Sequence, residues 1–384
     1  MNGMLHGIRV IELGTVITAP LAGMMLGDLG ADVIKVERPG GDPFRRSQGD
    51  AYGSTFLAYN RNKRGIVLDL TTERDRAVLL NLVDGADVLL DNFRPSVLSK
   101  LDLAPETLRE RNPRLIQCSI TGFGSTGPYR DRPAFDGVGQ ALSGIASLFV
   151  NPQEPQAFGP TISDNVTGMY ACCAILGALV ERATTGRGRR LEVNMLEASM
   201  AFAPDVFTNF TRAGTVSGPF TRVATSQSFA FRCGDGGLLA IHLSTPEKFW
   251  LRLVAAIEAP ELGIDERFAV HLRRVNHYHV LRDELARRFL TKPRAEWLER
   301  LAAADVPAAP IWNVAESLDD PQVQALGTVL ETRHPSEGVI RSIHCPILVD
   351  GERPQNRMAP PPLLGEHTAE ILSETSQDCS HEKG

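Results

Sequence analysis

The sequence lacks the short motifs that mark the most familiar nucleotide and hydrolase sites. No G-x-G-x-x-G follows the first predicted strand, because Gly14-Thr-Val-Ile-Thr-Ala-Pro20 occupies that turn. The chain also contains no P-loop, no G-x-S-x-G and no H-E-x-x-H. An assignment as a nicotinamide dehydrogenase would rest on the fold alone, and the missing glycine fingerprint argues against it. P-loop phosphate binding, serine hydrolysis and zinc-dependent proteolysis have no signature here either.

Cysteine is scarce, and the histidines are scattered. The six cysteines form no C-x-x-C pair, so we expect free thiols in a reducing compartment and a cytoplasmic location. Among the nine histidines, His277 and His279 are close in sequence, but residues two apart on a helix point to different sides. We therefore expect no metal site.

Long apolar and long basic runs are also missing. The N-terminus has no basic region followed by an apolar core, so no signal peptide is expected. The least polar early stretch, residues 16–27, is too short and too rich in glycine to span a bilayer. The net charge is -6, and no block of lysine and arginine stands out. We expect neither a membrane nor a nucleic acid as partner.

What the sequence does contain is the composition and pattern of an α/β protein. Its 384 residues exceed what one hydrophobic core usually serves, which favours two domains. Strand-like and helix-like segments alternate through the first half, which predicts a doubly wound α/β domain with a parallel sheet. The predicted strands are residues 8–13, 31–37, 65–70, 86–90, 115–120 and 191–195.

The pattern changes after residue 210. Residues 211–227 are rich in Ser, Thr, Gly and Pro and are predicted to be a linker. Two β-prone segments then flank Gly234-Asp-Gly-Gly237, which predicts a hairpin. Helical segments follow at 247–257, 277–290 and 295–304, so residues 228–320 are predicted to form a small α+β domain. Short strands return at 329–333 and 342–348.

Polar and aromatic residues collect where the predicted parallel strands end. Ligands of open α/β sheets bind at these carboxyl ends, and Arg, Lys and backbone N–H groups suit phosphate. Each position alone is more often a helix cap or a solvated side chain. Together they favour a nucleotide-like, phosphate-bearing ligand. The positions are Val16, Ile17 and Thr18, then Arg38, then Leu70 and Thr71, then Asn92, Phe93 and Arg94.

Asp164 begins the long apolar segment 164–184, which is predicted to be a buried helix. The common role of an aspartate at this place is to cap the helix. A helix N-terminus also stabilises an anion, and an ionised carboxylate beside a thioester can act as a nucleophile.

Several longer segments resemble one family. They include Leu26-Gly-Asp-Leu-Gly-Ala-Asp-Val-Ile-Lys-Val-Glu-Arg-Pro-Gly40, Asn60-Arg-Asn-Lys-Arg64, Asp91-Asn-Phe-Arg-Pro95, Asp164-Asn-Val-Thr-Gly168 and Pro362-Leu-Leu-Gly-Glu-His-Thr368, with further matches at 7–13, 112–116, 119–124, 127–129, 133–136 and 185–188. In this order the sequence resembles the class III CoA-transferases, the group of formyl-CoA transferase and carnitine CoA-transferase. The most similar branch acts on dicarboxylates of the succinate or hydroxymethylglutarate type.

This resemblance implies a fold, an assembly and a reaction. A Rossmann-like large domain would combine residues 1–210 with the return segment 321–384, around the small domain, and two chains would form an interlocked homodimer. Coenzyme A would pass from an acyl-CoA to a free carboxylic acid through an aspartyl-CoA intermediate on Asp164. Coenzyme A would be a substrate, and no prosthetic group is implied.

The resemblance also implies a set of CoA-binding residues along the strand ends. These are Val16, Ile17, Thr18, Arg38, Leu68, Leu70, Thr71, Asn92, Phe93, Arg94, Lys100 and Arg132. Arg132 is included because a phosphate-binding lysine of some family members corresponds to a position near Pro133 in this chain. Arg130 or Arg132 would take the place of that lysine. A second departure concerns the glycine run that covers the intermediate in some members. Residues 223–227, Val-Ala-Thr-Ser-Gln, stand in its place.

Two alternative functions remain at this point. An α-methylacyl-CoA racemase needs a histidine before Asp136, where this chain has Phe135, and phenylalanine cannot transfer a proton. A non-catalytic CoA-binding protein would not need Asp164. Proton exchange, acyl exchange and the substitution Asp164→Ala separate these functions.

Overall fold

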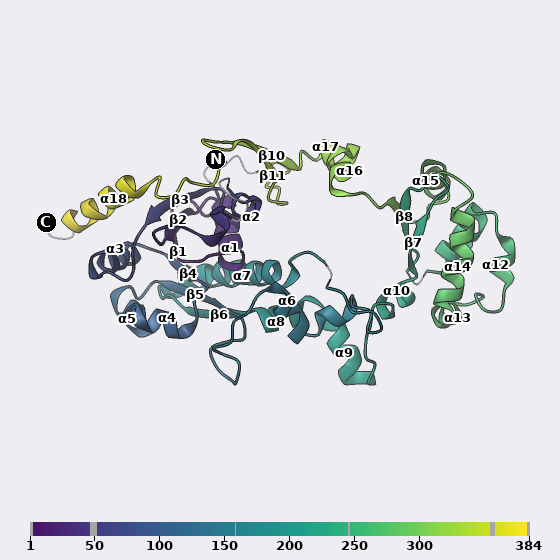
Figure 1. Ribbon diagram of the computed structural model, residues 1–384, viewed down its shortest axis with the longest axis horizontal. Helices are drawn as coiled ribbons and strands as arrows, with labels where there is room; N and C mark the ends of the chain where they lie inside the picture. The colour runs from purple at the N-terminus through teal and green to yellow at the C-terminus, as the bar shows by residue number, and fades with distance from the viewer. Residues whose placement is uncertain (1–2, 47–51, 158, 245, 354–357, 382–384) are drawn as a thin grey trace. The chain divides into compact units, whose positions relative to one another are not determined.

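The chain forms two compact units in this computed structural model, which describes residues 3–46, 52–157, 159–244, 246–353 and 358–381 (Figure 1). The first unit consists of Met1–Ala146, Gly159–Pro204 and Thr328–Gly384. The second consists of Ser147–Phe158 and Asp205–Gly327. The first unit is therefore built from both halves of the sequence, with the second unit inserted.

A six-stranded parallel sheet is the centre of the first unit (Figure 1). Its strand order is β3-β2-β1-β4-β5-β6, and each neighbouring pair is parallel. This confirms the predicted α/β fold with a parallel sheet. The chain moves outward from β1 to β3 and then returns to β4, so the order reverses between β1 and β4. The strands are β1 (Arg9–Glu12), β2 (Asp32–Glu37), β3 (Lys63–Val67), β4 (Val88–Asp91), β5 (Ile116–Thr121) and β6 (Arg190–Asn194).

Helices cover both faces of this sheet, which explains why its central strands are apolar on both sides. On one face, Ala19 of α1 and Ile175 of α7 join a buried cluster with Val10. On the other face, Leu82 of α3 joins a cluster with Ile11. The helices of this unit are α1 (Thr18–Asp28), α2 (Ser54–Tyr59), α3 (Glu73–Asp84), α4 (Pro95–Lys100), α5 (Pro105–Arg111), α6 (Asp136–Leu142), α7 (Ile162–Thr185), α8 (Met195–Phe202) and α18 (Thr368–His381), with 3-10 turns at Pro43–Arg46 and Ile145–Leu148.

Helix α7 is the longest helix among the described residues and ends at Gly186, whose φ of 68° closes it in the left-handed conformation. By length and composition alone it is apolar enough to cross a membrane. It packs against α1, α8, β5 and β6, so part of its apolar surface belongs to the core of the unit. The opposite side leaves Met169, Tyr170 and Val180 exposed.

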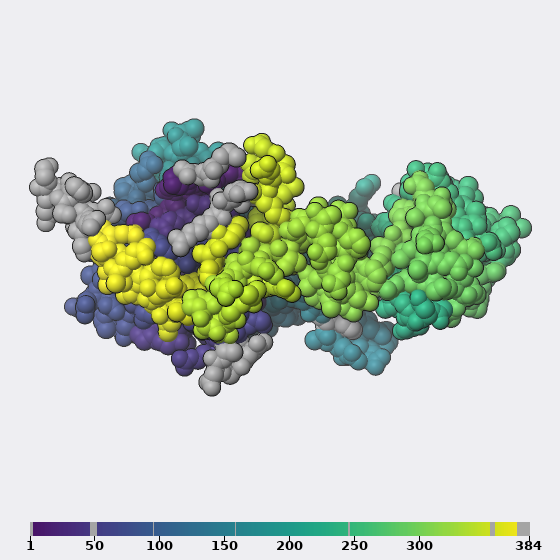
Figure 2. All heavy atoms as spheres, turned by 90° about the horizontal axis from the view of Figure 1, so that it is seen from above, coloured from purple at the N-terminus to yellow at the C-terminus, as the bar shows by residue number. Residues whose placement is uncertain are grey.

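The end of the chain packs onto the edge strand β3. Arg64 forms ion pairs with Glu370 and Glu374 of α18, and Ile371 is fully buried in the second core cluster. Figure 2 shows this C-terminal segment, in yellow, beside the purple N-terminal part of the same unit. Before α18, β10 (Val329–His334) pairs antiparallel with β11 (Gly338–Ile343).

The predicted strand at 342–348 was wrong. The second strand of this hairpin starts at Gly338 and ends at Ile343. The turn between His334 and Gly338 is short, so these two residues form the first pair of the hairpin. This pair sets the register, in which Ile343 is opposite Val329.

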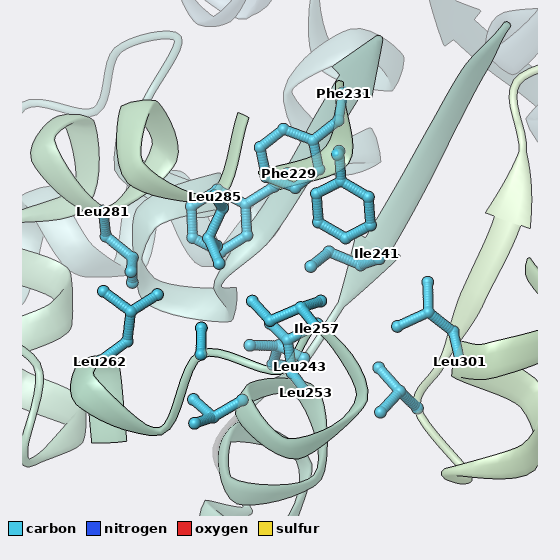
Figure 3. Packing of buried hydrophobic residues seen from close by; sticks show 14 of the residues in the cluster. Phe229, Phe231, Ile241, Leu243, Leu253, Ile257, Leu262, Leu281, Leu285 and Leu301 are labelled. Carbon is cyan, nitrogen blue, oxygen red and sulfur yellow. The ribbon is translucent and has the colours of Figure 1, made fainter. Parts of the chain in front are cut away.

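The second unit has its own sheet and core, with antiparallel order β7-β8-β9. The hairpin expected around residues 234–237 is present. Figure 3 shows Phe229, Phe231 and Ile241 of the sheet packing against helical Leu253 and Leu285. Its elements are α9 (Pro204–Ala213), α10 (Thr221–Ser226), β7 (Ser228–Arg232), β8 (Leu238–His242), α11 (Glu247–Ala256), α12 (Pro260–Ile264), α13 (His271–Asn276), α14 (Tyr278–Phe289), α15 (Arg294–Ala303), β9 (Ala308–Pro310), α16 (Val314–Asp319) and α17 (Pro321–Ala325), α9 beginning at the boundary.

Candidate active site

The turn between β1 and α1 is held at the point where the strand order reverses. The side chain of Asn92, after β4, accepts a hydrogen bond from Thr15 N at 3.0 Å. Its amide nitrogen donates to Thr15 O at 2.7 Å and to Thr18 Oγ1 at 3.1 Å. Between these residues Val16 has φ 70°, a conformation that costs a β-branched residue about 1–3 kcal/mol.

The turn after β4 is shaped by Asp91. This buried carboxylate accepts hydrogen bonds from Phe93 N at 3.1 Å and from Ser119 Oγ at 2.8 Å. Burial raises the pKa of Asp91 to about 6. The hydrogen bond to Phe93 N fixes the direction in which the chain leaves the strand, and so places Phe93 and Arg94 at the strand end.

Close backbone contacts bring the start of α7 to this turn. A β-carbon on Gly168 would lie 2.7 Å from Thr18 O, and one on Gly139 would lie 2.3 Å from Ser163 Oγ. Glycine at these two places lets α1 and α6 approach the first turns of α7. Asp164 and Gly168 are four residues apart and share one face of the helix.

Asp164 does not cap α7, because the helix begins earlier, at Ile162. The backbone N–H of Asp164 instead donates to Asp136 Oδ1 at 3.1 Å. Asp136 Oδ2 in turn accepts from Gln140 Nε2 at 2.5 Å. A carboxylate from α6 thus satisfies an N–H group at the start of α7, and Asp164 is one of the residues that line the pocket.

The electrostatic environment makes the Asp164 carboxylate more basic than usual. Asp164 is 6% exposed, and this burial raises its pKa to about 6, with a further contribution from the negative charge of Asp136. We expected the helix terminus to favour the anion, but burial and the like charge outweigh it. The carboxylate is still mostly ionised at neutral pH, and it is a stronger base than an ordinary aspartate.

These elements enclose a pocket of about 300 Å³ at the carboxyl ends of β1, β4 and β5. The pocket brings together many of the residues that the sequence singled out. They are Val16, Ile17, Thr18, Asn92, Phe93, Arg94, Arg132 and Asp164.

The remaining candidate residues lie outside the pocket lining. Arg38 is exposed after β2, Leu68 is buried after β3, and Lys100 is exposed at the end of α4. Leu70 is half-buried, and the exposed Thr71 donates through Oγ1 to Asp69 Oδ1 at 2.6 Å. Their proposed contacts with coenzyme A stay predictions.

The loop before α6 supplies pocket residues whose placement the sequence did not reveal. Phe135 lines the pocket and is 69% exposed, although the sequence used it only to argue against a racemase. A β-carbon on Gly122 would lie 2.3 Å from Ala134 Cβ, so glycine after β5 lets this loop approach. Arg132 stacks on Tyr129, with its guanidinium carbon 3.9 Å from the ring centre.

The segment 223–227, expected to stand in place of the glycine run, belongs to the second unit. Residues 223–226 form the end of α10, and Gln227 follows with φ 50°. Gln227 is buried, and its Oε1 accepts a hydrogen bond from Arg274 Nε at 3.1 Å. In this structure the segment is thus fixed within its own unit rather than being an open loop.

Comparisons with known proteins identify the family. Residues 5–368 match the model of CoA-transferase family III. This chain belongs to CoA-transferase family III. The succinate–glutarate CoA-transferase of Agrobacterium fabrum (strain C58 / ATCC 33970) is 34% identical, over 96% of this chain and 95% of the relative. The succinyl-CoA–L-malate CoA-transferase beta subunit of Chloroflexus aurantiacus (strain ATCC 29366 / DSM 635 / J-10-fl) is 35% identical, over 98% and 95%.

A solved structure supports the same family. A CAIB/BAIF family protein from Brucella suis has a TM-score of 0.86 and 34% identity, with 98% of this chain and 100% of that chain covered. This family III CoA-transferase is an enzyme that uses CoA thioesters as substrates. No group of three His, Cys, Asp or Glu side chains is placed to hold a metal within the part of the chain that the structure describes.

Proposed function

We propose that this CoA-transferase moves coenzyme A from an acyl-CoA to a free dicarboxylic acid through a covalent intermediate on Asp164. The observation that carries the proposal is the position of this carboxylate. It is almost fully buried, its pKa is raised to about 6, and it lines a pocket at the reversal of strand order, where ligands of α/β sheets bind.

The reaction would proceed by four balanced acyl transfers. A carboxylate oxygen of Asp164 attacks the thioester carbonyl and gives a mixed anhydride and the CoA thiolate. The thiolate attacks the aspartyl carbonyl, which gives an aspartyl-CoA thioester and releases the donor carboxylate. The acceptor carboxylate attacks this thioester and forms a second anhydride. The thiolate then attacks the acceptor carbonyl and regenerates Asp164, with no net proton transfer.

Dicarboxylic acids are proposed because of the relatives and the charge of the pocket. The names of the two relatives above contain succinate, glutarate and malate, which have two carboxylates each, and succinyl-CoA, the monothioester of succinate. Here Arg94, Arg130 and Arg132 line the pocket that contains Asp164. Guanidinium groups bind carboxylates and phosphates through paired hydrogen bonds, so this wall suits both an acid and part of coenzyme A.

Coenzyme A would extend from the pocket along the neighbouring strand ends. In this proposal its reacting end lies beside Asp164, against the turn at Val16 and the ring of Phe93. The adenosine and phosphate end would reach the candidate residues that lie outside the pocket lining. These are Arg38, Leu68, Leu70, Thr71 and Lys100.

The enzyme is proposed to be an interlocked homodimer, with a large domain of residues 1–210 and 321–384 and a small domain of residues 228–320. Residues 211–227, predicted to be the linker, include α10 and belong to the second unit. Supporting the homodimer, α6, α7 and α8 lie against one another and expose large apolar side chains, which is typical of an interface. They are Val138, Leu142, Met169, Tyr170, Val180, Met200 and Phe202. Light scattering on the purified protein would measure the mass.

A cytoplasmic location is proposed from the cysteines. Cys118, Cys172, Cys173, Cys233 and Cys345 are free thiols in the described structure, as expected in a reducing compartment.

Mass spectrometry tests the covalent step directly. Enzyme incubated with succinyl-CoA and then treated with hydroxylamine should carry a hydroxamate on the peptide that contains Asp164. The Asp164→Asn variant, which keeps the size of the side chain, should carry none. A hydroxamate on another carboxylate, or succinyl-CoA:glutarate transfer at the wild-type rate by the variant, would show that Asp164 is not the nucleophile.

A further inference from the structure

The turn between β1 and α1 lines the pocket in a conformation that its sequence disfavours. Val16 has φ 70°, and β-branched residues rarely adopt the left-handed region. We propose that Asp42, fixed by the buried Lys35, is a positioning residue that holds Val16 in this conformation for binding of the acyl-CoA. The inference rests on the function proposed above.

Asp42 lies in the loop after β2 and is 3% exposed. Its Oδ2 accepts a hydrogen bond from the backbone N–H of Val16 at 3.2 Å. Its Oδ1 accepts from Phe44 N at 2.9 Å, and its own N–H donates to Glu37 Oε1 at 2.9 Å. The loop therefore fixes Asp42 through two bonds and leaves Oδ2 directed at the turn.

Lys35 connects Asp42 to the residue before the turn. Its Nζ is fully buried, lies 3.3 Å from Asp42 Oδ2, and donates to Glu12 Oε1 at 3.0 Å and to Gly14 O at 2.7 Å. Burial alone would lower the pKa of Lys35. The carboxylates of Glu12, Asp42 and Glu37 outweigh burial, so the pKa is raised and the ammonium stays charged.

The negative charges of the network are balanced by a second cation. Lys63 Nζ lies 2.8 Å from Glu12 Oε2 and donates to Pro20 O at 2.8 Å, in the first turn of α1. The two lysines thus hold backbone carbonyls on both sides of the turn, at Gly14 and Pro20. Asp42 holds the N–H group between them.

Folding alone does not account for a valine at this place. Glycine adopts a φ of 70° without strain, and buried ion pairs often add little net stability compared with apolar side chains. Val16 lines the pocket, so a valine at this place can give the ligand apolar surface that glycine lacks. A strained residue held at a ligand site indicates a functional constraint.

The substitution Asp42→Asn tests the inference, because it keeps the side-chain size and removes the charge and one acceptor. We expect KM for succinyl-CoA to rise about 10-fold or more while kcat changes less than about 3-fold. Calorimetry with coenzyme A alone should show a Kd raised by a similar factor. This readout needs no transfer, so it tests the turn even if Asp164 proves not to be the nucleophile.

Asp28→Asn is a matched control. Asp28 is 2% exposed, pairs with Arg61 at 2.5 Å, and lies outside the pocket lining. Both substitutions remove a buried charge, so both should lower the melting temperature. Only Asp28→Asn should leave KM for succinyl-CoA unchanged. An equal rise in KM in both variants, or a normal KM and Kd in Asp42→Asn, would overturn the inference.

Val16→Gly provides a second test that leaves the buried charges in place. Because the strain disappears, the melting temperature should not fall, while KM for succinyl-CoA should rise as the apolar surface is lost. In this background Asp42→Asn should raise KM by no more than about 2-fold further. A lower melting temperature in Val16→Gly, or a full effect of Asp42→Asn in both backgrounds, would contradict the role assigned to Asp42.

Discussion

The two units bury different kinds of side chain. Within the first three strands of the parallel sheet the first unit buries charged side chains, namely Glu12 of β1, Lys35 of β2 and Lys63 of β3. The second unit has an aromatic and aliphatic core, and Arg274 is its one buried charged residue within the part of the chain that the structure describes. Buried charges are expensive to desolvate, and here Lys35 and Asp42 hold the turn that lines the pocket. The first unit thus contains buried charges that hold the pocket, whereas the second unit is stabilised mainly by apolar packing.

The largest expected effect breaks the chemistry of the first unit. Asp164→Asn should lower the rate of CoA transfer by at least about 10³-fold, because an amide cannot form the anhydride. A coupled assay that follows succinyl-CoA consumption measures this loss. A rate within about 10-fold of wild type would remove Asp164 from the mechanism.

The same variant should be more stable than the wild type. The pKa of Asp164 is raised from 3.8 to about 6, so the native state holds the proton more tightly than the unfolded state. This contribution to stability is present below pH 3.8 and is lost as pH rises through about 6. At neutral pH Asp164→Asn should gain at most about 3 kcal/mol in the free energy of unfolding, measured by urea titration. An equal gain at pH 4 and at pH 7.5 would contradict this cause.

A core substitution in the second unit tests the packing side of the comparison. Leu285→Ala removes a fully buried side chain and should cost about 2–5 kcal/mol. Hydrogen exchange should accelerate in peptides of the second unit and leave β1 and β4 protected. Faster exchange of β1 to the same degree would mean that the units do not have separate stabilities.

Asp136 tunes the nucleophile and should have a smaller effect. Its negative charge adds to burial in raising the pKa of Asp164. In Asp136→Asn the ascending limb of the profile of kcat/KM against pH, near 6 in the wild type, should therefore move to lower pH by part of a unit. An unmoved limb, or a shift to higher pH, would assign that limb to another group.

The smallest expected effect concerns two of the arginines that line the pocket, Arg130 and Arg132. Arg132→Gln should raise KM for succinyl-CoA about 3- to 10-fold. Arg130→Gln should change it less, because Arg130 is already paired with Asp131 at 3.0 Å. The reverse order would mean that Arg130 is the residue that replaces the lysine of other family members.

The sequence was informative where local pattern determines structure. Apolar runs predicted the parallel strands, and strand-end residues such as Val16 and Asn92 were expected at one ligand site. Only the resemblance to a family added Asp164 to that site. The sequence could not show that Asp136, 28 residues earlier, accepts the N–H of Asp164, because that bond exists only after α6 packs on α7. The buried network of Lys35 has no local signature either, since a lysine within a strand usually indicates a solvent-facing position.

The position of α18 has a consequence for synthesis of the chain. Ile371 of α18 belongs to a core cluster of the first unit, so that core cannot be completed until Ile371 has left the ribosome. The inserted unit, Asp205–Gly327 with a short earlier segment, has almost its whole core available sooner. The second unit can therefore fold during translation before the first unit is complete. One face of the parallel sheet stays incompletely covered until α18 has been synthesised and has packed onto it.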